Sequence, residues 1–96
     1  MAHFYISVYK LLITLDQVED FTNLQKYAAK AVELTPENVM AHYWLIHSMN
    51  HLGTLELAKN EIAHAKAVLT DEEFESLKKQ VAMDNTMPYN ALFADK

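Results

Sequence analysis

The chain has 96 residues, of which 51% are hydrophobic, enough for a single modest core. It contains no cysteine, which excludes a disulfide framework, a thiolate nucleophile and a cysteine-based zinc site, so we expect a reducing, cytoplasmic environment. Eight Lys and Arg side chains against thirteen Asp and Glu give a net charge of −5. This charge opposes phosphate backbones and anionic lipid, so we expect no direct binding to nucleic acid or membranes.

Residues that break helices are few and fall at regular intervals. One glycine and two prolines occur in the whole chain, and turn-forming residues cluster at four places. These breaks predict five helices, near residues 3–16, 20–34, 38–52, 54–69 and 71–83, followed by a tail over residues 84–96. We expect residues 1–83 to form one helical domain and the tail to be partly disordered.

The first predicted helix is apolar on nearly every side. In the largely apolar run from Phe4 to Leu15, Lys10 is the only charged residue. The run is too short to span a bilayer and lacks the flanking pattern of a signal peptide, so a buried amphipathic helix is predicted. Such a helix must be covered on nearly every side, which favours a homodimer paired through it across a two-fold axis. The apolar tail is the alternative cover, although a frayed terminus is the default expectation for residues 84–96.

Local chemistry supports three of the breaks between helices. Pro36 has no backbone N–H and ends the second helix just before it. Gly53 can adopt the left-handed conformation that closes the third helix, and Thr54 can then cap the fourth. Thr70 followed three residues later by Glu73 is a capping-box pattern for the fifth helix.

An internal repeat appears when the sequence is shifted against itself by 34 residues. Apolar positions then coincide in both helices of each unit, and small residues recur where antiparallel helices would approach closely. The aligned pairs include Tyr9 with Tyr43, Leu11 with Leu45, Leu12 with Ile46, Leu24 with Ala58, Ala28 with Ile62, and Ala31 with Ala65.

Residues 39–70 resemble a tetratricopeptide repeat (TPR), and residues 5–38 resemble a second one. The first resemblance rests on Leu45, Leu52-Gly53, Ala58, Ile62 and Ala65, and the second on Leu11, Ala31 and the segment Leu34 to Asn38. His42 and Val8 depart from the tryptophan that the family favours, and Leu12 and Ile46 replace a small residue. The resemblance implies an all-α, antiparallel helix-pair (TPR-like) α–α superhelix of two repeats plus a capping helix over residues 71–83.

The family's role implies a protein–protein interaction module that binds a peptide or helix in its concave groove and catalyses no reaction. The first helix of each repeat lines that groove in the family. The residues expected to contact a partner are Tyr9, Lys10, Ile13, Met40, Tyr43, Trp44, His47, Asn50 and His51. Because this set is largely aromatic and aliphatic, a helix or an extended apolar peptide is the expected ligand. For Trp44, burial in the core is as well supported as exposure in the groove.

Residues 34–69 also resemble the bacterial transcriptional activator domain, through Ala41-His42, Leu52-Gly53 and Ala58. This second resemblance implies, as an alternative, a regulatory or oligomerisation domain of a bacterial transcriptional regulator.

A small metal-binding protein is the second alternative, because His47 and His51 lie four residues apart on one helix face. No carboxylate nearby in the sequence completes a ligand set, so exposed groove histidines are favoured and no metal ligand or cofactor is predicted. The chain's serines lack a nucleophile elbow or a glycine-rich oxyanion loop. We therefore predict no catalytic residue.

Overall fold

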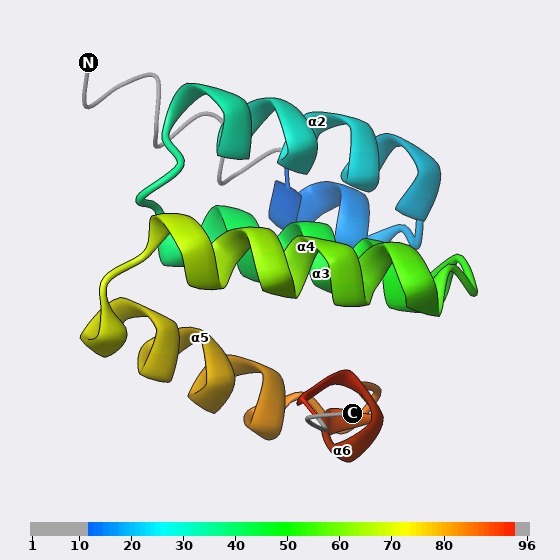
Figure 1. Cartoon of the computed structure of the whole chain (residues 1–96). Coiled ribbons are helices and arrows are strands. Elements are labelled where there is room, and N and C mark those ends of the chain that lie inside the picture. The colour runs from blue at the N-terminus through cyan, green and yellow to red at the C-terminus, as the bar shows by residue number, and fades with distance from the viewer. Residues whose placement is uncertain (1–11, 94–96) are drawn as a thin grey trace.

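The computed structural model describes residues 12–93, and every regular element in that range is a helix (Figure 1). Residues 12–17 are the described end of the first predicted helix. The elements that follow are α2 (Phe21–Leu34), α3 (Val39–His51), α4 (Leu55–Val68), α5 (Asp71–Met83) and α6 (Tyr89–Phe93). The all-helical prediction is confirmed, and α2 to α5 begin and end within a residue of their predicted bounds. Within the described range no helix is both long enough and apolar enough to cross a membrane.

The helix ends follow the predicted local chemistry with one exception. Gly53 has a φ of 77°, in the left-handed region, where it closes α3. Thr70 and Glu73 form the complete capping box of α5. Thr54 stands at the N-cap position of α4, but its hydroxyl donates to the carbonyl of Met49 at 2.8 Å and makes no capping bond. The expectation that Thr54 caps α4 through its side chain is therefore wrong.

Helix α3 lies at the centre of the fold and packs against α2, α4 and α5. In Figure 1 the α3–α4 pair runs between α2 on one side and α5 with α6 on the other. Two clusters of apolar side chains fill the space between these helices. One joins Leu12, α2 and one face of α3, and the other joins the opposite face of α3 with α4, α5 and α6.

The burial pattern repeats with the period found in the sequence. Helices α2 and α4 each contain 14 residues, and their first residues, Phe21 and Leu55, are 34 positions apart. The N-cap residues of the two helices, Asp20 and Thr54, are also 34 positions apart, as are the C-cap residues, Thr35 and Leu69. The pairs that are buried in both helices are Leu24 with Ala58, Ala28 with Ile62, and Ala31 with Ala65. Small side chains thus occupy close helix contacts in both units, which is the packing that the repeat requires.

Enlarging these alanines should destabilise the fold. We expect Ala31→Leu and Ala65→Leu each to cost about 1–3 kcal/mol in the free energy of unfolding, because a larger side chain overpacks a close helix contact. Ala63→Leu is the matched control, since Ala63 is exposed on α4. Urea denaturation measures all three variants. If Ala65→Leu proved as stable as Ala63→Leu, the tight α3–α4 packing would be contradicted.

Residues 84–93 pack against the helices that precede them. Met87 and Leu92 are buried in the cluster formed with Ile46 and the buried face of α4, and Phe93 lies edge-on to Phe74. At the other end, Leu12 is buried and Ile13 is 45% exposed. The remaining part of the apolar helix expected to mediate a homodimer, residues 3–11, lies outside the described residues, so self-association stays a prediction.

Candidate functional site

The segment Asp84–Met87, between α5 and α6, lies along one face of α3, from Tyr43 to His51. Oδ2 of Asp84 accepts a hydrogen bond from the Tyr43 hydroxyl at 2.7 Å. The other oxygen, Oδ1, accepts from the backbone N–H of Thr86 at 2.9 Å and from its hydroxyl at 2.6 Å. The backbone carbonyl of Thr86 accepts a hydrogen bond from the side-chain amide of Asn50. The hydroxyl of Thr86 lies 3.1 Å from Nε2 of His51. The chain therefore occupies part of this face of α3 with its own residues.

His47 joins this segment to the first helix. Its Nδ1 lies 2.7 Å from Oδ2 of Asp84, and its Nε2 lies 2.7 Å from Oδ1 of Asp16. A carboxylate oxygen can only accept, so both contacts are hydrogen bonds when the ring carries a proton on each nitrogen. With only 6% of its surface exposed, His47 acts as a buried bridge between two carboxylates.

The surroundings of Asp84 alter the acidity of its carboxyl and of Tyr43. Burial alone would raise the pKa of Asp84, but hydrogen bonds from Thr86, Tyr43 and His47 outweigh it and lower the pKa to about 2. Burial, together with the bond to this carboxylate, raises the pKa of Tyr43 above its ordinary value. Asp84 is therefore ionised and Tyr43 neutral across the physiological range, as their mutual hydrogen bond requires.

The nine residues predicted to contact a partner are distributed unevenly. Tyr9 and Lys10 lie outside the described residues. Four of the others, Tyr43, His47, Asn50 and His51, are engaged with Asp84 or Thr86. The three that remain, Ile13, Met40 and Trp44, are exposed or half-buried.

The environment of His47 differs from the one expected. The sequence favoured an exposed histidine with no carboxylate near it, and both expectations are wrong for His47. Asp16 and Asp84 are 31 and 37 residues away in the chain, so no local spacing signals their approach. His51 is exposed as expected, and its ring stacks on Phe21 with centroids 4.3 Å apart.

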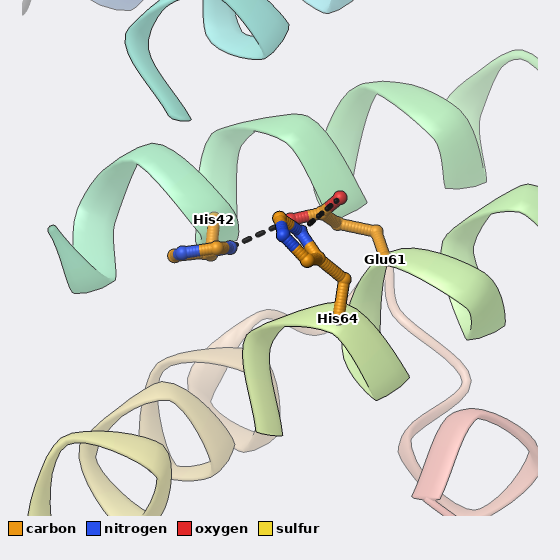
Figure 2. Close-up of side chains that lie close together, drawn as sticks. All are labelled: His42, Glu61 and His64. Carbon is orange, nitrogen blue, oxygen red and sulfur yellow. Dashed lines mark hydrogen bonds and ion pairs between the residues drawn. The ribbon is translucent and has the colours of Figure 1, made fainter. Parts of the chain in front are cut away.

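A second polar cluster lies on the other side of α3, where His42, Glu61 and His64 meet (Figure 2). His42 is fully buried. Its Nδ1 lies 2.6 Å from Oε2 of Glu61, and its Nε2 lies 2.6 Å from the carbonyl oxygen of Pro36. Nδ1 of His64, one turn along α4 from Glu61, lies 3.6 Å from Oε1 of the same carboxylate.

His42 and Glu61 form a buried ion pair. Burial acts to lower the pKa of His42, but the hydrogen bonds with Glu61 and with the Pro36 carbonyl overcome it, so the pKa is raised above its ordinary value. The doubly protonated ring donates from both nitrogens, which satisfies both acceptors. The sequence marked His42 as a departure from a favoured tryptophan and as part of the resemblance to the bacterial transcriptional activator domain, but not as a member of this pair. The spacing of Glu61 and His64, three residues apart on one helix, was the available signal.

This cluster borders a groove between α2 and α4 with a volume of about 430 Å³. The groove is mainly apolar, with Val32, Leu45 and Val68 among its lining residues, and Glu61 and His64 face it from α4. A buried histidine, a largely buried carboxylate and an exposed histidine thus lie between the core and a solvent-accessible recess.

A scan of protein-family models and searches of curated proteins and of solved structures each find no match to this chain. What the protein does is therefore inferred from its own residues and their arrangement.

Proposed function

We propose that this chain is a TPR-like helical-repeat module that binds another protein and catalyses no reaction. The observation that carries the proposal is the 34-residue period shared by the sequence, by the bounds of α2 and α4, and by their buried small residues. A unit of this length with two antiparallel helices is typical of tetratricopeptide repeats, which present helix faces to other proteins. The net charge of −5 favours a protein partner over nucleic acid.

The binding surface that we propose is the N-terminal half of α3 together with the end of the first helix. Met40 and Trp44 are one turn apart on α3 and are half-buried, and Ile13 is exposed. The Trp44 ring lies edge-on to Tyr43 and His47, with centroids 5.1 and 5.7 Å away, so its orientation is fixed. A rigid, partly exposed aromatic ring provides a large contact area at small entropic cost, as the anchors of protein interfaces do.

The polar side chains of α3 that face Asp84 and Thr86 have a different role in this proposal. Asp84 and Thr86 already satisfy Tyr43, His47, Asn50 and His51, so the polar residues that the sequence assigned to a partner are used within the chain. A peptide that needed them would have to displace the segment Asp84–Met87. Binding beside this segment, on Ile13, Met40 and Trp44, keeps those hydrogen bonds.

Selection of displayed helical and extended apolar peptides against the whole chain tests this surface. We expect Trp44→Ala to weaken the selected peptides at least about 10-fold, equivalent to about 1.4 kcal/mol, because the ring is the proposed anchor. Leu57→Ala is the control, since Leu57 is an exposed apolar residue on α4, away from the proposed surface. Circular dichroism establishes whether each variant keeps its helicity.

Amide chemical shifts locate the bound peptide independently of any substitution. The proposal expects the largest changes around Ile13, Met40 and Trp44. A footprint confined to α2 and α4, or equal weakening by the Leu57 variant, would contradict the proposed surface.

A further inference from the structure

We propose that His42, Glu61 and His64 form a Zn²⁺ site whose open coordination position faces the groove between α2 and α4. One ligand atom from each of these side chains lies within 4.8 Å of the others, and no other such group of three occurs among residues 12–93. Figure 2 shows the two imidazole rings directed at the Glu61 carboxylate. Two imidazoles and one carboxylate, with a water completing the coordination, are a donor set that Zn²⁺ accepts.

The distances require only small side-chain movements to admit the ion. Zn²⁺ bonds of about 2.0–2.1 Å in tetrahedral geometry place neighbouring ligand atoms about 3.3 Å apart. The observed separations are 2.6 Å from Nδ1 of His42 to Oε2 of Glu61 and 3.6 Å from Nδ1 of His64 to Oε1 of Glu61, and the ligand atoms of the two histidines lie within 4.8 Å of each other. On binding the ion, the distance between His42 and Glu61 must increase and the distance between Glu61 and His64 must decrease slightly. His64 is on the surface, with 49% of its side chain exposed, and can rotate towards the ion.

The Pro36 carbonyl prepares His42 to act as a ligand. It accepts from Nε2 at 2.6 Å, which fixes the plane of the ring and directs Nδ1 at Glu61. A histidine that binds a metal commonly donates its other N–H to a backbone carbonyl or a carboxylate in this way. Binding of the ion displaces the proton on Nδ1 to solvent, and the nitrogen lone pair then binds the metal.

Helix geometry and the groove supply the remaining requirements. Glu61 and His64 are three residues apart on α4, so both side chains emerge on the same face. The recess of about 430 Å³ that they border gives the ion a route from solvent and room for a water ligand. The other described histidines are arranged differently: His47 is held between Asp16 and Asp84 through separate nitrogens, and His51 stacks on Phe21.

Isothermal titration of the untagged, chelator-stripped chain with Zn²⁺ tests the proposal. His3 lies outside the described residues, so every protein in the series also carries His3→Gln. We expect one ion per chain, and an affinity at least about 10-fold lower in His64→Gln, because that change removes one of three protein ligands. Glu61→Gln should weaken binding at least as much. His64→Gln changes an exposed ring, so its metal-free helicity should equal that of the parent.

His51→Gln is the matched control, because it removes a histidine on the opposite face of α3 and should leave the Zn²⁺ affinity unchanged. Co²⁺ used in place of Zn²⁺ should give the visible absorption of a four-coordinate ion in the parent and lose it in His64→Gln. The proposal is overturned if the parent binds no Zn²⁺ up to about 1 mM, which corresponds to very weak affinity. It is also overturned if His64→Gln binds like the parent, or if His51→Gln weakens binding as much as His64→Gln does.

Discussion

Replacing His42 with leucine should lower the free energy of unfolding of the metal-free protein by about 3–5 kcal/mol, the usual cost of removing one partner from a buried ion pair. The His42 side chain is fully buried and that of Glu61 is only 10% exposed. Leucine removes the closer partner of the Glu61 carboxylate, leaving only His64 at 3.6 Å, and leaves the Pro36 carbonyl without its donor. Both losses are costly because each leaves a largely buried polar group without its hydrogen-bond partner. Urea denaturation in the presence of a chelator measures the effect.

Two further variants distinguish the contribution of the buried ion pair to the free energy of unfolding from the general effect of a substitution. Lys30 and Glu33 form an ion pair on the surface of α2, with side chains 64% and 69% exposed. Lys30→Ala should therefore change stability by no more than about 1 kcal/mol. The double variant His42→Leu/Glu61→Leu should recover much of the loss, because no unpaired charge remains in the interior. A His42→Leu protein as stable as Lys30→Ala would show that the buried pair is not important for folding.

The helices were predictable because their boundaries depend on local chemistry. Pro36, Gly53 and the Thr70–Glu73 capping box act within one or two helical turns, so their spacing in the sequence suffices. The repeat of 34 residues is likewise visible in the sequence alone. Helix α6 is only five residues long, too short for a periodic pattern to predict it, and its burial depends on the helices that precede it.

The polar clusters were not predictable because they join residues far apart in the chain. Asp84 meets Tyr43 and His47 across 41 and 37 residues, and His42 meets Glu61 across 19. Helix α3 packs against three other helices, so most of its faces are covered. A periodicity argument that assigns one face to the core and one to solvent therefore fails for His47.

Replacing Asp84 with asparagine should cost about 2 kcal/mol at pH 7. The Asp84 side chain is 8% exposed, and its two oxygens accept from Tyr43, from both donors of Thr86 and from His47. Asparagine has the same shape but only one accepting oxygen, and its amide nitrogen faces donors. The lowering of the pKa of Asp84 from 3.8 to about 2 leads to the same estimate, since each pKa unit corresponds to about 1.4 kcal/mol.

The dependence of the free energy of unfolding on pH tests this prediction most directly. Because the pKa of Asp84 is lowered in the folded chain, its carboxylate stabilises the fold fully above about pH 4, and this contribution is lost as the pH falls to about 2. The stability difference between the parent and Asp84→Asn should therefore shrink over that interval. Asp20→Asn is the control, because Asp20 caps α2 and asparagine caps a helix about as well. Urea denaturation at pH 7, 4, 3 and 2 measures both variants. A difference for Asp84→Asn that stayed constant down to pH 2 would mean that the ionised carboxylate does not organise this end of α3.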